Sequence, residues 1–506
     1  PPRSTLFPYT TLFRSQPHYE ILNDLIINED LSIKSALYYY SGKGFYDYDG
    51  SWADSSSLRL TSDFGFITKY NPRNAIIRAC VSNHQLGWIP RLIYKHSFGE
   101  LTTGIEIRFH RSEHWGNINY SEYLPENFYP DYKFYSNEGS RDIFSFFARE
   151  IIDINEDLKI SVEGQIVNHY YRINNEKAGE IYTSYFDING NLIGNGNDIF
   201  NVNYVFFNPR LGVNYNFSDK INLYALTAYT SREPRMRNLY AADDSYFGAA
   251  PLFKSIQKNG YTYYDFSNPL IKPESMLNIE LGSNYRDENF FVNLNLYLME
   301  YFDELVKSGR VDINGNPIDE NAPKTRHYGV ELQSGINLLS SRLGNLNLEA
   351  NITLSENTIV DYAFKVDENQ YISLNGNPIS GFPNFMANFK INYQFQNLFL
   401  SFSGKYVGDF RTDNYGDLLK TNDLLINYLK NDYFYTGYYQ DNIVDSYAVF
   451  NLDLSYKIEK ILSLKDLRLQ LQINNLFNSI YAAGGEGKDF FPAAERSFFF
   501  GIELNL

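Results

Sequence analysis

The residues best suited to binding a ligand are three closely spaced arginines near the middle of the chain. Arg232, Arg235 and Arg237 stand in the segment SREPRMR, residues 231–237, directly after a run with strand-like alternation. Guanidinium groups bind carboxylates and phosphates through paired hydrogen bonds, so three of them in one place could hold an anionic ligand. The same arginines could equally pair with carboxylates of the protein itself.

Aromatic side chains follow in the same segment of the chain. Tyr261, Tyr263 and Tyr264 stand close together, and aromatic rings of this kind can form a surface for a flat ligand. The competing explanation is that a large loop packs these rings against its neighbours. The sequence therefore predicts a ligand-binding site formed by the arginines and the tyrosines, and leaves the packing role open.

Other residues that could do chemistry are sparse. His110 and His114 have HxxxH spacing, but in a strand they would lie about 13 Å apart, too far to share one metal ion. The runs 187–191 and 312–316 begin like calcium loops but lack the required later Gly and Glu, and their Asn-Gly pairs predict tight turns. No nucleophile elbow, Walker loop or dinucleotide fingerprint is present. We expect no catalytic residue, no bound metal, no cofactor and no enzyme activity.

Composition narrows the class of protein. The chain has 506 residues, and its 44 Tyr and 39 Phe help to raise the hydrophobic share to 43%, which argues against a disordered chain. The mean hydropathy is −0.38, and no run approaches the roughly 20 apolar residues of a membrane helix. The single Cys80 excludes a disulfide framework, and the net charge of −16 disfavours nucleic acid as a partner.

The elements that must position the arginines and tyrosines are strands, because the dominant period is two. Apolar and polar residues alternate through 467–474, 346–354, 292–298 and 450–456. Such alternation is typical of strands with one apolar and one polar face, and helical periodicity is nowhere sustained. The chain is therefore predicted to be all-β, with about seventeen strands.

The connections between successive strands, here called joins, alternate between short and long. The short ones lie near residues 28–30, 98–100, 155–157, 218–220, 286–289 and 396–397, and the long ones near 42–83, 111–140, 172–203, 232–272, 303–323, 359–381 and 412–444. A soluble sandwich would have a strand every 8–12 residues, whereas this chain has about one in 30. The layout predicts a transmembrane antiparallel β-barrel with short periplasmic turns and long extracellular loops.

Several motifs resemble those of one family. The closing segments INNLFNSIY (473–481) and FPAAERSF (491–498) resemble the end of a TonB-dependent outer-membrane receptor. The segments NPRLGV (208–213), IKPE (271–274) and GVEL (329–332) agree in order and spacing, and YYYSGKGFY (38–46) is similar to receptors of the Bacteroidetes group. The resemblance covers almost everything from about residue 18 onward.

The resemblance implies a function and its partners. It implies energised uptake of a scarce ligand, most often a ferric siderophore or another iron complex, across a Gram-negative outer membrane. The implied partners are the inner-membrane TonB energy-coupling complex, outer-membrane lipid and an anionic or aromatic small ligand. Two alternatives stay open: a passive channel, and a barrel that anchors a surface complex for glycan or peptide uptake together with a surface lipoprotein.

The sequence also suggests where the barrel segment begins. Residues 1–15 repeat Thr-Leu-Phe and resemble a translated sequencing-adapter scar, so we assign the barrel to residues 16–506. The family resemblance implies 22 strands. Seventeen strands counted back from the C-terminus would then leave five strands, the plug domain and the TonB box upstream of this sequence.

Overall fold

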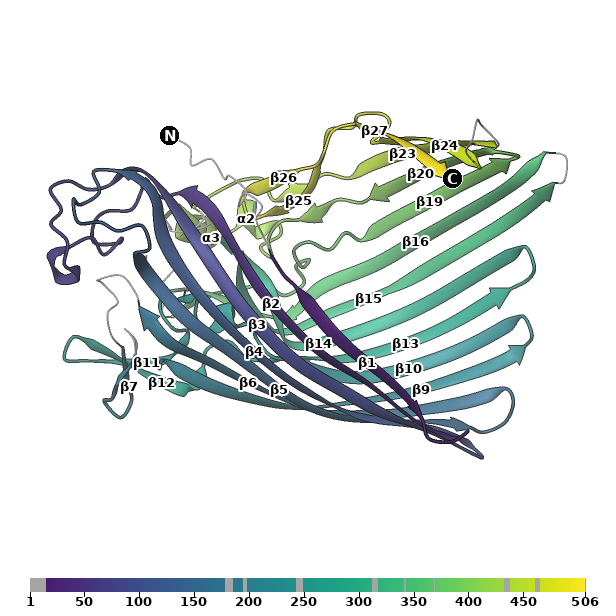
Figure 1. Cartoon of the computed structure of the whole chain (residues 1–506), viewed down its shortest axis with the longest axis horizontal. Coiled ribbons are helices and arrows are strands. Elements are labelled where there is room, and N and C mark those ends of the chain that lie inside the picture. The colour runs from purple at the N-terminus through teal and green to yellow at the C-terminus, as the bar shows by residue number, and fades with distance from the viewer. Residues whose placement is uncertain are drawn as a thin grey trace. The chain divides into compact units, whose positions relative to one another are not determined.

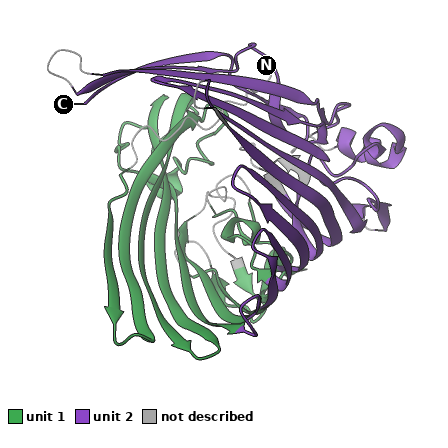
Figure 2. Cartoon of the chain, turned by 90° about the vertical axis from the view of Figure 1, so that its right-hand side faces the viewer, with its two compact units in different colours: residues 1–152, 162–209, 231–273 green, residues 153–161, 210–230, 274–506 purple. Residues whose placement is uncertain are grey.

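The fold consists mainly of β-strands (Figure 1). The computed structural model describes residues 15–177, 185–193, 198–242, 249–311, 317–340, 343–367, 369–431, 437–459 and 465–505. The chain divides into two compact units, coloured separately in Figure 2. Unit 1 holds residues 1–152, 162–209 and 231–273, and unit 2 holds residues 153–161, 210–230 and 274–506.

Within the described ranges, seventeen strands belong to one antiparallel sheet, which confirms the number that the sequence predicts. Within each unit, each strand pairs with the sheet strand next to it along the chain, as β2 pairs with β1 and with β3. The strands are β1 (His18–Ile26), β2 (Leu31–Asp49), β3 (Arg73–His96), β4 (Gly99–Glu122), β5 (Lys133–Asp153), β6 (Leu158–Lys177), β9 (Phe200–Ser218), β10 (Ile221–Arg232), β13 (Glu274–Arg286), β14 (Phe290–Val311), β15 (Pro317–Ser340), β16 (Gly344–Asp361), β19 (Phe385–Phe395), β20 (Leu398–Val407), β23 (Tyr447–Glu459), β24 (Asp466–Asn474) and β27 (Ser497–Asn505).

The remaining elements are short, and all of them lie in the long joins. They are η1 (Ser62–Phe64), β7 (Tyr185–Asp187), β8 (Leu192–Ile193), α1 (Met236–Leu239), β11 (Phe253–Lys258), β12 (Tyr261–Pro269), β17 (Ala363–Asp367), β18 (Gln370–Ser373), β21 (Phe410–Arg411), α2 (Leu418–Thr421), α3 (Asp423–Asn431), β22 (Ile443–Val444), β25 (Ala482–Glu486) and β26 (Asp489–Pro492). In the described ranges, no helix has both the length and the apolar character needed to span a bilayer.

Strand register separates an apolar face from a polar one. In the β16–β19 pair, Leu348 lies opposite Ile391, while the next residue, Glu349, lies opposite Lys390. The apolar face is not covered by protein: Leu296 of β14 retains 42% of its accessible surface. A row of exposed Leu, Ile and Phe is unfavourable in water and suits a surrounding of lipid chains.

Glycines of several strands sit directly opposite aromatic residues of the neighbouring strand. A Cβ built on Gly404 would lie 2.4 Å from the ring of Phe389, its partner in the register. Gly87 lies opposite Tyr38, and Gly335 lies opposite Phe291, in the same arrangement. A Cβ on either glycine would lie 2.3 Å from the ring of its partner. These rings lie across the strand at positions where any side chain would block them, so each pair needs its glycine.

Two of the short joins are closed by asparagine side chains. The Oδ1 of Asn28 accepts hydrogen bonds from the backbone N–H groups of Asp30 and Leu31, at 3.0 and 2.8 Å. Asn155 does the same for Asp157 and Leu158, at 2.9 Å each. The side chain replaces a backbone acceptor, which lets two long strands reverse over a few residues.

Several of the long joins are shorter than the sequence predicts, whereas the join expected near 412–444 is longer and runs from residue 408 to 446. The join expected near 42–83 is confined to residues 50–72, because β2 and β3 stay paired from Leu31–Tyr94 out to Asp49–Ile76. Likewise β14 and β15 remain paired at Lys307–Asp319, inside the join expected near 303–323. The predicted boundaries were wrong because strands beyond the apolar belt keep their hydrogen bonds but lose the alternation that marks them in the sequence.

Buried hydrophobic residues gather in three clusters, and these lie at the long joins. One cluster in unit 1 joins the segment after β2 to the start of β5, through Leu58, Leu60 and Phe134. A second in unit 1 joins β6, β9 and the segment after β10, through Ile173, Phe200 and Leu239. The third, in unit 2, packs α3 against β17 and β18, through Leu425, Phe364 and Ile372. The long joins are therefore packed structures with cores of their own.

Candidate functional site

The predicted ligand-binding residues lie in the long join between β10 and β13, in unit 1. This join contains α1 and the hairpin of β11 and β12, closed by Asn259 and Gly260 with φ of 54° and 78°. Two successive residues with positive φ form the tight turn that matches the twist of a hairpin. β12 also pairs with β7 in parallel, so that β8, β7, β12 and β11 form a small four-stranded sheet.

The strand period splits the predicted tyrosine group. Tyr261 and Tyr263 lie two residues apart and both contact Phe186 of β7, with ring centroids 5.3 Å apart in each case. Tyr264 faces the other way, is 7% exposed and stacks on Phe266 at 5.6 Å within the hydrophobic cluster. Tyr261 and Tyr263 therefore present an accessible aromatic face, and Tyr264 packs the loop beneath it.

The three arginines lie on the surface of the same join. Arg232 is the last residue of β10, Arg235 precedes α1, and Arg237 lies within α1; all three side chains are exposed. Arg232 and Arg237 already interact with other groups of the protein. Glu233 and Pro234 between them are buried, which holds the backbone inward while the guanidinium groups face solvent.

Glu233 is the centre of a buried polar network that the sequence did not reveal. It is 8% exposed, forms an ion pair with Arg141 of β5, and accepts a hydrogen bond of 2.8 Å from the Tyr171 hydroxyl of β6. His169 Nδ1 lies 3.3 Å from the same carboxylate, and the Arg141 guanidinium lies 5.2 Å from the centre of the Tyr171 ring. This network fastens the arginine segment to the strands that carry it.

A second buried polar network lies in unit 2. Asp413 is fully buried and accepts hydrogen bonds from the backbone of Tyr415 at 2.8 Å, the Tyr439 hydroxyl at 2.8 Å and the Asn442 amide at 3.0 Å. Burial raises the pKa of the Asp413 carboxyl and of the Tyr439 hydroxyl above their usual values. These bonds join the segments before and after α3.

Glu486 of β25 is another buried acid of unit 2, and it is paired with a lysine of β14. Its side chain is 2% exposed, and its carboxylate lies 2.6 Å from the Nζ of Lys307. Burial raises the pKa of Glu486 to about 6, and the ion pair with Lys307 opposes this rise. The hairpin of β25 and β26 is therefore attached to β14 through a partly compensated buried charge.

The weaker candidates are resolved by their local geometry. Asp187 accepts hydrogen bonds from the side chain and backbone of Asn191, at 2.8 Å each, and these bonds lower the pKa of its carboxyl. The run 187–191 is thus a turn, while 312–316 lies outside the described residues. His110 and His114 both lie on β4. Across the described ranges, no cluster of three or more metal-ligating side chains is present.

Comparison with known proteins decides the family. A family model described as "TonB dependent receptor-like, beta-barrel" matches residues 7–476. The chain belongs to the TonB-dependent receptors. No curated protein matches the sequence.

Solved structures agree with this family. The copper transporter OprC is 13% identical with a TM-score of 0.64, and the match covers 97% of this chain and 65% of OprC. The ferric-catecholate import receptor Fiu from E. coli K12 is 14% identical with a TM-score of 0.62, covering 97% of this chain and 64% of Fiu. The ferric yersiniabactin uptake receptor FyuA from Yersinia pestis is 12% identical with a TM-score of 0.59, covering 97% and 60%.

At these identities the solved structures show the shared fold, and the present TonB-dependent receptor chain spans 60–65% of their lengths. TonB-dependent receptors are outer-membrane proteins of Gram-negative bacteria, and this places the exposed apolar strand face in lipid. The family and fold are those of receptors and transporters. The Bacteroidetes origin and the division at residue 15 stay predictions.

Proposed function

We propose that this chain is the barrel of an outer-membrane receptor for TonB-coupled uptake of a scarce anionic ligand, a ferric siderophore or another iron complex. The family match over residues 7–476 carries this proposal. Neighbours that import ferric catecholate and ferric yersiniabactin support the choice of an iron complex. The inner-membrane TonB complex is the partner that the family implies.

The join between β10 and β13 supports an anionic, aromatic cargo. Arg232, Arg235 and Arg237 expose positive charge on a segment that Glu233 anchors, and Tyr261 and Tyr263 offer rings on the neighbouring hairpin. Catecholate and citrate complexes of iron carry the negative charge that guanidinium groups bind well. The anchoring fixes the backbone of the arginine segment before a ligand arrives, which reduces the entropy lost on binding.

The test is ligand binding by the triple variant Arg232→Ala/Arg235→Ala/Arg237→Ala of the full-length native protein. Ferric citrate and the ferric complex of 2,3-dihydroxybenzoate serve as probes, and quenching of intrinsic fluorescence reports binding. We expect at least a ten-fold loss of affinity for the preferred probe, with heat-modifiable migration on a gel unchanged. Uptake of the radioactive iron complex by whole cells should fall in parallel.

The control is Lys254→Ala/Lys258→Ala, which removes exposed positive charge from β11 in the same join. We expect this variant to bind within two-fold of the parent. Equal affinity of the triple arginine variant and the parent would refute the role of the arginine segment. Uptake that continues without TonB would instead support the passive channel.

A further inference from the structure

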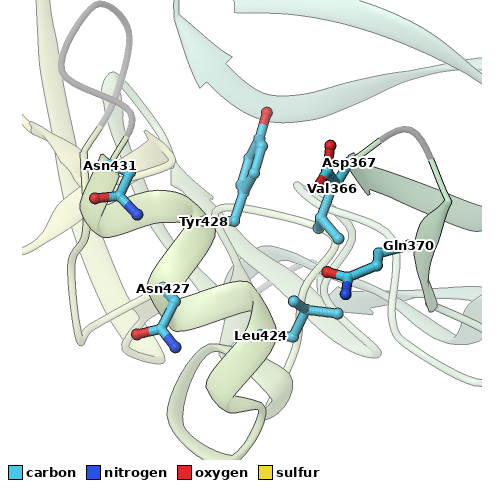
Figure 3. Close-up of a pocket in the computed structure, with 7 residues that line it drawn as sticks. All are labelled: Val366, Asp367, Gln370, Leu424, Asn427, Tyr428 and Asn431. Carbon is cyan, nitrogen blue, oxygen red and sulfur yellow. The ribbon is translucent and has the colours of Figure 1, made fainter.

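A second, chemically different pocket lies among the loop elements of unit 2. Helix α3 forms one wall and the hairpin of β17 and β18 forms the other, and the open pocket between them has a volume of about 450 Å³ (Figure 3). This volume falls in the range that small-molecule ligands occupy. We refer to it as the α3 pocket.

Four of the lining residues come from a single face of α3. Leu424, Asn427, Tyr428 and Asn431 follow the spacing i, i+3, i+4, i+7, which places their side chains along one stripe of a helix. The adjacent stripe, which includes Leu425 and Leu429, is buried in the hydrophobic cluster of unit 2. Burial of the leucine stripe thus fixes which residues α3 turns toward the pocket.

The ring of Tyr428 is held in place from behind. Phe364 of β17 packs against it edge to face, with centroids 5.4 Å apart and an interplanar angle of 82°. Phe364 in turn packs on the buried Tyr415 at 5.5 Å. Leu424 and Val366 complete the apolar part of the wall. The α3 pocket therefore contains a positioned aromatic ring with aliphatic groups beside it (Figure 3).

The polar part of the wall consists mainly of carboxamides. Gln370, Asn427 and Asn431 contribute three amide groups, each with a donor and an acceptor, and Asp367 adds a carboxylate. Within the part of the chain that the structure describes, no protein group hydrogen-bonds these three side-chain amides. No lysine or arginine is among the described lining residues, so the pocket is unsuited to an anion.

We propose that the α3 pocket binds one sugar unit of a neutral oligosaccharide. Sugar hydroxyl groups donate and accept hydrogen bonds at once, as do carboxamides, and the C–H face of a pyranose ring is apolar enough to pack on an aromatic ring. The arginine segment in unit 1 offers the opposite chemistry, exposed positive charge for an anion. The proposal therefore adds a second recognition site to the receptor and does not depend on the proposed cargo.

The experiment measures sugar binding directly, without transport. The full-length native protein in detergent is studied by saturation-transfer NMR with maltotriose, cellotriose and mannotriose, and affinities are obtained by titration calorimetry. Delipidated lipopolysaccharide polysaccharide is a fourth probe, which separates a surface-attached sugar chain from a dissolved one. We expect binding of at least one of the four, and at least a ten-fold loss of that affinity in Asn427→Ala/Asn431→Ala.

Tyr428→Ala should abolish the signal, and Tyr428→Phe should retain it within three-fold because the ring is preserved. The asparagine variant guards against misfolding, since both side chains are exposed on a helix that tolerates Ala. Tyr371→Ala is the matched control, because Tyr371 is 57% exposed on β18 and does not line the pocket.

Three outcomes overturn the proposal. The first is the absence of saturation transfer to all four probes in the parent protein. The second is unchanged affinity in the asparagine variant, and the third is displacement of the sugar by ferric citrate or by the neutral peptide trialanine at equal concentration. Loss of iron-complex binding by the triple arginine variant would leave sugar binding intact, so the two proposals fail separately.

Discussion

At the residue scale, buried acids decide how the long joins are attached to the strands. Glu233 and Glu486 are 8% and 2% exposed, and each has a basic partner on a strand, Arg141 and Lys307 respectively. A buried ion pair adds little net stability, but the loss of one partner leaves the other with its desolvation uncompensated. Replacing either acid should therefore loosen the attachment of its long join to the strands, whereas replacing an exposed acid should not.

The first prediction concerns Glu233→Gln. The change leaves Arg141 without its counter-charge, and because the Arg141 side chain is 36% exposed, solvent reduces the loss to about 1–2 kcal/mol. Hydrogen exchange of the α1 amides should accelerate roughly ten-fold, since local opening becomes easier. Glu156→Gln, at an exposed position in a short join, is the control and should leave exchange unchanged. Equal protection of α1 in both variants would contradict the anchoring role.

The second prediction concerns pH and the hairpin of β25 and β26. Burial raises the pKa of Glu486 from 4.5 to about 6, so the folded state holds this proton more tightly than the unfolded state. The resulting stabilisation is complete below pH 4.5 and is lost as the pH rises through about 6, a difference of about 2 kcal/mol. Hydrogen exchange of residues 482–492, corrected for its intrinsic pH dependence, should show weaker protection at pH 7.5 than at pH 5.

Glu486→Gln should remove this part of the pH dependence, because the amide resembles the protonated acid. The buried Asp413 has a pKa raised in the same direction, so the comparison is between the parent and the variant at each pH. Glu495→Gln, which changes an exposed acid in the same join, is the control. If Glu486→Gln retains the full difference in protection between pH 5 and pH 7.5, another titrating group causes that difference.

At the element scale, sequence periodicity predicted the sheet well and the join boundaries poorly. The alternation through 467–474 predicts the face of each residue of β24 correctly: Leu469 lies opposite Ile502, and Leu471 lies opposite Phe500. It could not mark where β2 ends, because residues paired outside the lipid have no apolar face. Nor could it separate Tyr264 from Tyr263, since which ring is buried depends on how the hairpin packs against β6 and β9.

The third prediction tests the assignment of faces. Leu471→Lys places a charge on the apolar face near the middle of β24 and should destabilise the inserted barrel by about 2–4 kcal/mol. Gln472→Lys places the same charge one residue later, on the polar face, and should be tolerated. The readouts are the yield of heat-modifiable protein in outer membranes and the urea midpoint in detergent. Similar folding of the two variants would contradict the assignment of the apolar face to the lipid side.

At the scale of the whole molecule, the number of strands and the family could be predicted from the sequence, but the buried polar networks could not. Strand count depends on local alternation, which each segment carries by itself. Arg141 and Glu233 are far apart in sequence and meet only through the fold, as do Lys307 and Glu486. The α3 pocket likewise joins two separate segments, so neither of them indicates it alone.

The fourth prediction concerns the extent of the working barrel. The family resemblance implies 22 strands, and the part of the chain that the structure describes contributes seventeen to the sheet. Unpaired backbone groups facing lipid cost several kcal/mol each, so residues 16–506 alone should aggregate or fail to show heat-modifiable migration in liposomes. The native full-length reading frame should fold and take up its ligand under the same conditions. Ligand uptake by residues 16–506 alone would show that this segment is sufficient.

The glycines that lie opposite aromatic rings also constrain how the sequence can change over time. At the Gly404–Phe389 pair, any side chain gained by the glycine first meets a ring at 2.4 Å, whereas a smaller residue in place of Phe389 leaves only a gap. Mutational paths through such a pair therefore have a direction: the ring shrinks before the glycine grows. The same order applies to Gly87 with Tyr38 and to Gly335 with Phe291. Sequences descending from this one should contain the intermediate with two small residues, and not the one with two large residues.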